Sequence, residues 1–181
     1  MSIKMKNGLT IKKLVMIAMF SAVIAVCSQI SVPLPVGVPI TLQTFAVALC
    51  GYLLGTKSAL ISVAVYISVG TVGVPVFSNF KGGIGVLFGK TGGFIAGFLL
   101  LVLFCGIGIK RKHATFAIAL GLLGLAALHL FGSVWYAYLS RISLSASVLA
   151  VSAPFIVKDA VSVTFAYFFA ARLRNILKTD I

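Results

Sequence analysis

The chain is organised around one glycine-rich stretch, Lys81-Gly-Gly-Ile-Gly-Val-Leu-Phe-Gly-Lys-Thr-Gly-Gly-Phe-Ile-Ala-Gly-Phe98. On a helix, glycines spaced four residues apart would form one stripe almost free of side chains, here Gly85, Gly89, Gly93 and Gly97. Such a stripe lets membrane helices approach closely, and glycine also lets a backbone approach a ligand. The pattern leaves both readings open. We expect Gly82 and Gly83 to lie near a ligand, and Gly93 and Gly97 to form a helix–helix seam.

Part of this stretch, Phe88-Gly-Lys-Thr91, resembles the end of a phosphate-binding loop. That motif requires a further glycine five positions before the glycine that precedes lysine, and here this position is Ile84. The surroundings are hydrophobic, and the required strand does not precede the motif. We therefore do not expect this chain to bind a nucleotide.

Composition predicts an integral membrane protein, because 61% of the residues are hydrophobic and only 9% are charged. A crossing takes about 20 apolar residues, so about five to seven helices fit and no separate soluble domain does. The net charge of +13 could suggest nucleic acid. The basic residues, however, cluster at the ends of apolar segments, which is typical of topology signals and of contacts with membrane lipid. We therefore do not expect nucleic-acid binding.

The residue types do not favour an enzyme or a metal centre. The three cysteines lie singly inside apolar runs, without metal-ligand spacing, so we expect neither a metal ion nor a cofactor. Asp159 and Asp180 are the only acidic residues, and no carboxylate pair is available for acid–base catalysis. Ser133, His129 and Asp159 could form a Ser-His-Asp set, but their spacing does not favour it. We expect His129 to be a packing residue and not a ligand-binding one.

The apolar segments predict an all-α integral membrane protein, a single domain over residues 1–181 with six transmembrane helices. The expected helices span about 14–30, 40–54, 58–69, 83–108, 114–138 and 147–172. The turn Gly55-Thr-Lys57 is short, so the second and third helices should be antiparallel neighbours. The first apolar run is too long for a signal peptide, so we keep it as a helix.

The charge distribution predicts that both termini are cytoplasmic. With six helices, eleven of the 15 basic residues fall on the side of the termini, which is a strong positive-inside bias. These residues are Lys4, Lys6, Lys12, Lys13, Lys57, Lys110, Arg111, Lys112, Arg172, Arg174 and Lys178.

Two loops are expected at the outer end. The uncharged segment 31–39 holds three of the five prolines, so it should be extended, stiff and packed over the bundle. The segment 69–81 mixes helix-breaking residues with aromatic ones, and Phe77 and Phe80 could plug into the top of the bundle. We interpret this second segment as a candidate lid.

Ionisable residues inside a membrane are costly and are by default functional candidates. Lys158 and Asp159 lie in the last predicted helix, and Lys90 would be a second buried cation in the fourth. Asp159 could accept hydrogen bonds from a ligand and Lys158 could meet a carboxylate, or the two could form a structural ion pair. The amides of Gln43 and Asn79 can donate and accept at once, which suits a neutral polar ring. The residues alone indicate a solute-binding membrane subunit, a small channel or a scaffolding subunit.

Three motifs, in this order and spacing, resemble the BioY family of biotin-binding S components of energy-coupling factor (ECF) transporters. They are Val38-Pro-Ile-Thr-Leu-Gln-Thr44, Gly82-Gly-Ile-Gly-Val-Leu-Phe-Gly-Lys-Thr-Gly-Gly93 and Pro154-Phe-Ile-Val-Lys-Asp159. The similarity runs over nearly the whole chain. Lys90 and Lys158 depart from the family pattern, which often has proline and glycine, respectively, at these positions.

The resemblance implies a binding site and a set of partners. Biotin's ureido ring would meet Asp159, Asn79 and Gln43, with Gly82 and Gly83 nearby, and its carboxylate would meet Lys90 or Lys158. Ala18-Met-Phe-Ser-Ala22 is similar to the alanine motif by which S components dock on a transmembrane coupling subunit, which works with two cytoplasmic ATPases. The implied location is a prokaryotic cell membrane. The alternatives are an S component for another vitamin and a small channel or structural membrane protein.

Overall fold

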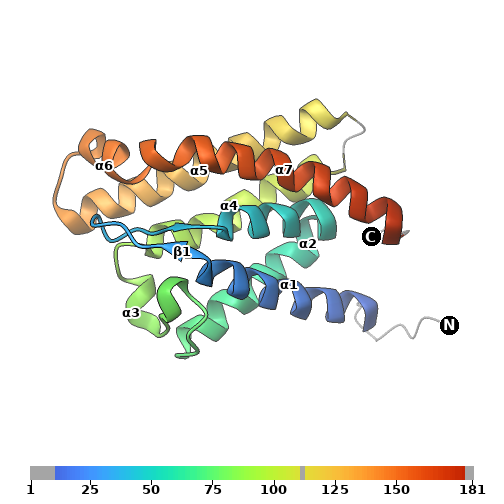
Figure 1. The fold of residues 1–181 in the computed structure, drawn as a ribbon, viewed down its shortest axis with the longest axis horizontal. Coiled ribbons are helices and arrows are strands. Elements are labelled where there is room, and N and C mark those ends of the chain that lie inside the picture. The colour runs from blue at the N-terminus through green and yellow to red at the C-terminus, as the bar shows by residue number, and fades with distance from the viewer. Residues whose placement is uncertain (1–10, 111–112, 178–181) are drawn as a thin grey trace.

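The computed structural model describes residues 11–110 and 113–177. Within these ranges the protein is a bundle of α-helices joined by short loops (Figure 1). A two-stranded antiparallel hairpin, which the sequence did not predict, pairs Ser31 with Thr41 and Val32 with Ile40. Five of the basic residues used for the topology prediction lie outside the described residues: Lys4, Lys6, Arg111, Lys112 and Lys178.

The elements follow one another in the order shown in Figure 1. They are α1 (Ile11–Gln29), β1 (Ser31–Val32), β2 (Ile40–Thr41), α2 (Gln43–Thr71), the 3-10 turn η1 (Ser78–Phe80), α3 (Ile84–Leu87), α4 (Gly92–Gly108), α5 (Ala114–Ser140), α6 (Leu144–Val151) and α7 (Ala153–Leu177).

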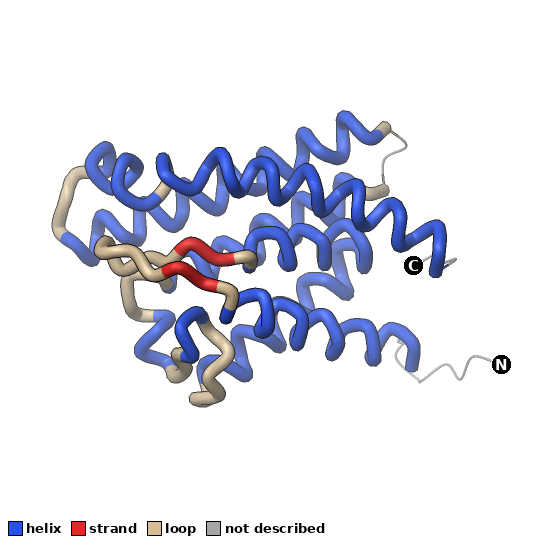
Figure 2. Tube along the Cα trace, viewed as in Figure 1, coloured by secondary structure: helices blue, strands red, loops and turns tan. Residues whose placement is uncertain are grey.

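The helix α2 forms the centre of the bundle and is its most buried long helix. It packs against α1, α4 and α7, and α4 packs in turn against α5. The start of α1 and the end of α7 lie at one end of the bundle, on the right in Figure 1. The strands, α3 and α6 lie at the opposite end, and Figure 2 shows the hairpin between α7 and α1 in this view. The hairpin, α3 and α6 are therefore gathered at one end, which we call the loop-bearing end.

The helix α2 reverses direction at Gly55, whose backbone angles (φ 70°, ψ 173°) interrupt the helical geometry. The reversal brings its two ends together, since Gln43 Nε2 donates a hydrogen bond to Tyr66 Oη at 2.6 Å. A straight helix rises about 1.5 Å per residue, so these side chains could not meet without it. The predicted antiparallel pair with a turn at Gly55 is confirmed.

Two other predicted helices are interrupted. The expected helix 83–108 is divided into α3 and α4 by a turn over residues 88–91, where Trp135 Nε1 donates to the carbonyl of Gly89 at 2.9 Å. The expected helix 147–172 is divided at Ser152, just before Pro154, whose ring cannot continue a preceding helix. Both breaks lie at the end of the bundle that carries the hairpin, α3 and α6.

The predicted seam at Gly93 and Gly97 is confirmed. A Cβ atom at Gly97 would lie 3.2 Å from Leu128 Cα, and one at Gly93 would overlap Trp135 Cβ. The absence of side chains at these positions lets α4 and α5 approach closely, as in other small-residue membrane interfaces. Because of the interruption at 88–91, Gly85 and Gly89 do not continue this stripe along one helix.

Among the described residues, four helices are long and apolar enough to cross a membrane: α1, α2, α5 and residues 153–176 of α7. The helix α4 is apolar but shorter. Many large apolar side chains on α1, α5 and α7 face outward, such as Val26, Leu130 and Phe165. A water-soluble protein rarely exposes so much apolar surface, and this distribution is that of a membrane protein.

Candidate functional site

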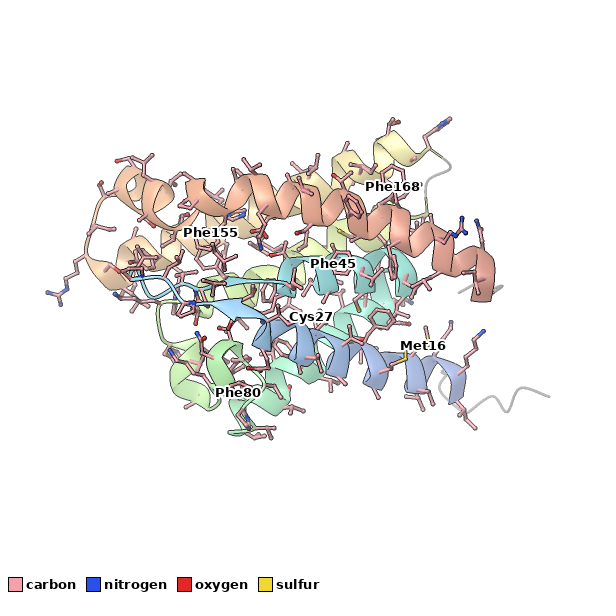
Figure 3. The ribbon with its side chains drawn as sticks, viewed as in Figure 1. Met16, Cys27, Phe45, Phe80, Phe155 and Phe168 are labelled. Carbon is pink, nitrogen blue, oxygen red and sulfur yellow. The ribbon has the colours of Figure 1, made fainter. Side chains whose placement is uncertain are left out.

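A cavity lies at the loop-bearing end of the bundle, between α2, α4, α5 and α7, under the hairpin and the loop 72–83. Its side walls are apolar and include Phe94, Phe98 and Phe155. We call its polar end the floor, which consists of Gln43, Thr44, His129, Lys158 and Asp159. Figure 3 labels Phe155 on α7 and Phe80 beside α3, on opposite sides of the hairpin in this view.

Asp159 is the buried charge of the floor, and its residue is only 4% exposed. Its Oδ1 lies 2.5 Å from Lys158 Nζ, and its Oδ2 lies 3.3 Å from His129 Nε2. Lys158 Nζ also donates to the carbonyl of Thr41 at 2.7 Å. The adjacent Lys158 and Asp159 therefore do pair with each other, and the lysine fixes the end of the hairpin to α7.

The floor keeps unused hydrogen-bonding capacity despite these close contacts. Neither Asp159 Oδ1 nor His129 Nε2 makes a hydrogen bond of good geometry with any described residue. Both atoms are buried and in close contact with a partner, Asp159 Oδ1 with Lys158 Nζ and His129 Nε2 with Asp159 Oδ2. A carboxylate oxygen can accept more than one hydrogen bond, so a ligand with N–H groups could bind Asp159 beside these contacts.

His129 connects Asp159 to a chain of hydroxyl groups. Its Nδ1 lies 3.1 Å from Ser152 Oγ, which lies 2.7 Å from Ser133 Oγ. The sequence predicted that His129 is a packing residue, and the structure places it both in this network and in the cavity wall. Ser152 is buried and does not line the cavity, so the Ser152–His129–Asp159 series presents no nucleophile to a substrate.

Gln43 is the first residue of α2 and is buried in the floor. Its Nε2 donates to Tyr66 Oη, and its Oε1 accepts from Thr41 Oγ1 at 3.2 Å. These contacts fix the orientation of the amide. The Gln43 side chain is therefore presented to the cavity in one defined position.

A second, wider cavity lies outside the first, and we call it the mouth. Pro39, Ser78 and Thr91 line both spaces, so the two cavities lie next to each other and together outline a path from the mouth to the floor. Apart from Val86, the other residues of the mouth are glycines or polar residues, and they include Asn79, Lys81, Gly82, Gly85 and Lys90. Polar groups thus lie at both ends of the path, with apolar walls between them.

The sequence predicted a buried cation at Lys90, and this prediction is wrong. Lys90 is exposed in the turn between α3 and α4, and its Nζ lies 5.7 Å from the centre of the Tyr136 ring. This turn separates α3 from α4, whereas the sequence predicted one continuous helix. Lys90 is therefore a residue of the mouth.

The predicted plug is confirmed for one phenylalanine and wrong for the other. Phe77 is 1% exposed and packs edge-on against Tyr66, with ring centres 5.5 Å apart. Phe80 is 73% exposed. Gly83 lines neither cavity and has a φ of 94°, whereas Gly82 lines the mouth.

Comparison with known proteins decides the family. The sequence profile described as the BioY family matches residues 2–179. The chain is a member of the BioY family. A relative from Thermotoga maritima, named biotin transporter BioY, is 38% identical over 91% of this chain and 97% of its own length. A relative from Pyrococcus horikoshii, named probable biotin transporter BioY, is 38% identical over the same shares.

The fold of this BioY protein also matches a solved structure. The crystal structure of the S component for biotin from an ECF-type ABC transporter superposes with a TM-score of 0.85 and 26% sequence identity. The match covers 94% of this chain and 95% of the other. The resemblance inferred from the three motifs is thus confirmed. This BioY protein is a membrane transport protein and not an enzyme.

Sequence reasoning found Gln43, Lys158 and Asp159, which lie in the floor, but did not place His129 there. The rule that ionisable residues inside a membrane are functional candidates would have found it. Among the residues that the structure describes, no group of His, Cys, Asp and Glu could hold a metal ion. Ala18 and Ala22, the predicted docking residues, are both exposed on α1.

Proposed function

We propose that this chain is the biotin-binding S component of an ECF transporter and takes up biotin across the cell membrane of a prokaryote. The observation that carries the proposal is Asp159, a buried carboxylate at the closed end of a cavity in a BioY protein. A carboxylate with a free acceptor site matches the N–H donors of a ureido ring. The apolar walls match a thioether ring and an aliphatic chain.

The proposed binding mode uses both ends of the path. The ureido ring lies on the floor, where Asp159 accepts from its N–H groups and the Gln43 amide and His129 Nε2 face its carbonyl. The carboxylate of biotin lies in the mouth near Lys90, with Asn79 and Gly82 beside it. Lys158 neutralises Asp159, since its Nζ contacts are already made with Asp159 and Thr41.

The proposed topology has six crossings, with α2 counted as two because it reverses at Gly55. The crossings are then α1, the two halves of α2, α4, α5 and α7. An even number is consistent with the start of α1 and the end of α7 at one end of the bundle (Figure 1). The basic residues predict that this end is cytoplasmic, which leaves the mouth open to the outside.

The proposed partners are a transmembrane coupling subunit and two cytoplasmic ATPases. Ala18 and Ala22 lie one turn apart on the exposed face of α1, where a partner helix can pack closely. Replacing either by Trp should abolish copurification with the coupling subunit and leave biotin binding intact. Ala126→Trp, at an exposed alanine of α5, is the matched control. A loss of both properties would mean that these alanines support the fold of the chain itself.

A titration of the purified protein with biotin and two analogues tests the ligand. We expect tight, saturable binding of one biotin per chain. Iminobiotin changes the ureido group that faces the floor and should bind at least tenfold more weakly. Biotin methyl ester lacks the carboxylate charge that would face the mouth, and its affinity should fall less than that of iminobiotin. Saturable binding of another vitamin instead would assign a different ligand, and no saturable binding would favour a channel or structural role.

A further inference from the structure

One side chain at the end of α1 holds the turn that closes the cavity. The Nε2 of Gln29 lies 3.2 Å from the carbonyl oxygen of Phe77, and its Oε1 accepts a hydrogen bond from the backbone N–H of Phe80 at 2.9 Å. One amide group therefore contacts both ends of the turn 77–80. The residues are 48 and 51 positions apart in the sequence, so this contact exists only in the folded chain.

The neighbours of Gln29 fasten the same segment. Ser28 Oγ lies 2.5 Å from the carbonyl oxygen of Val76, and Ser31 Oγ donates to Asn79 Oδ1 at 3.0 Å. Of these contacts, only those of Gln29 reach the backbone on both sides of Asn79. The end of α1 and the segment 76–80 are thus joined at three points, with Gln29 in the middle.

The turn needs such support because its backbone is unfavourable. Asn79 (φ 58°) and Phe80 (φ 54°) both occupy the left-handed region, which residues with a side chain rarely adopt. This conformation sends Phe77 inward, to the cavity wall and Tyr66, and leaves Phe80 outside. Ser78, between them, lines both the cavity and the mouth.

We propose that Gln29 is a positioning residue that latches the turn 77–80 over the cavity and thereby sets the rate at which the ligand leaves. Gln29 lines neither the cavity nor the mouth. Phe77 and Ser78 of the turn line the narrow cavity, and Ser78 also lines the mouth, so movement of the turn changes the way out of the cavity. The inference rests on the proposed function for the identity of the ligand, biotin.

Three variants of the full chain in lipid nanodiscs test the latch. Gln29→Ala removes both contacts with the turn, and Gln29→Glu keeps the acceptor for the Phe80 N–H but loses the donor to Phe77. Val26→Ala, at an exposed position on the same helix, is the control. The measurements are biotin association and dissociation rates, and hydrogen exchange of the segment 76–81 without ligand.

Because a net hydrogen bond contributes a factor of about two to ten, we expect Gln29→Ala to raise the dissociation rate about tenfold or more. The association rate should not fall, since the turn must open for binding as well. Exchange should become faster in the segment 76–81 and stay unchanged in α2. Gln29→Glu should have a smaller effect, and Val26→Ala none.

Unchanged dissociation and exchange in Gln29→Ala would overturn the proposal. Faster exchange throughout α1 and α2, with a lower melting temperature, would also overturn it, because Gln29 would then only stabilise the fold. If the wild-type protein binds no biotin, the proposed function fails. The exchange of the segment 76–81 then decides by itself whether Gln29 holds the turn.

Discussion

At the floor of the cavity, Asp159 and His129 are almost fully buried and lie between side chains from several helices. At the mouth, Asn79 and Lys90 are exposed and lie on loops rich in glycine. Long helices fix the floor, whereas side-chain contacts and a few backbone hydrogen bonds, such as those between Phe77 and Lys81, hold the mouth. From this difference we infer a division of roles, in which the floor determines which ligand binds and the mouth determines how fast it enters and leaves. Four predictions test this division.

The largest effect should come from the floor. Asp159→Asn replaces an acceptor with a group that can leave a ligand N–H unpaired, at a cost of about 1–3 kcal/mol. We expect biotin affinity to fall by at least tenfold, as measured by titration of the folded protein. The double variant Lys158→Met, Asp159→Asn should lose affinity as well, although it leaves no unpaired buried charge. Normal affinity in the double variant would make this pair a structural ion pair only.

The next effect concerns stability and compares two glycines. Gly97 lies under the cavity against Leu128, which lines it, whereas a Cβ at Gly85 in the mouth would meet open space. Overpacking a tight site costs about 1–3 kcal/mol, so Gly97→Ala should lower the melting temperature of the ligand-free protein. Gly85→Ala should not. Gly85 is a better control than Gly83, whose positive φ would add strain of its own. Equal melting temperatures for the two variants would contradict a tightly packed α4–α5 seam beside the cavity and an open mouth.

A smaller effect should follow from the hydroxyl behind His129. Ser152→Ala removes the partner of Nδ1 without touching the cavity, and one net hydrogen bond contributes about 0.5–1.5 kcal/mol. We expect biotin affinity to fall two- to tenfold, on the same principle, and Ser152→Thr to restore it. A change in melting temperature without a change in affinity would show that the Ser133–Ser152–His129 network supports the helices and not the floor.

The smallest effect should arise at the mouth. Lys90 is exposed, and an exposed ion pair contributes about 0.2–1 kcal/mol. Lys90→Gln should therefore weaken biotin binding only a few fold, mainly through a lower association rate that depends on salt concentration. Biotin methyl ester should bind the variant and the wild type equally well. An effect as large as that of Asp159→Asn would place the decisive contact at the mouth and reverse the division.

The sequence predicted features that depend on neighbouring residues, and it missed features that involve contacts between residues far apart in the chain. The seam at Gly93 and Gly97 was predictable because a helical repeat is a local property. The turn over residues 88–91 was not predicted, and one of its contacts comes from Trp135, which donates to Gly89 from 46 residues away. The exposure of Lys90 follows from that turn. Phe80 also faces outward, in a turn whose contacts with Gln29 span 48 and 51 positions of the sequence.

The sequence by itself determined the membrane class, the antiparallel pair at Gly55, the family and the identity of the one acid in the cavity. These follow from composition, from a glycine turn and from motifs that are each contiguous in the chain. Only the tertiary structure decided that Asp159 meets both Lys158 and His129, and that Lys158 is held by Thr41. The contacts with His129 and Thr41 join elements far apart in sequence, and their geometry depends on how the bundle packs. For this reason the sequence could name most residues of the floor but not how they are paired.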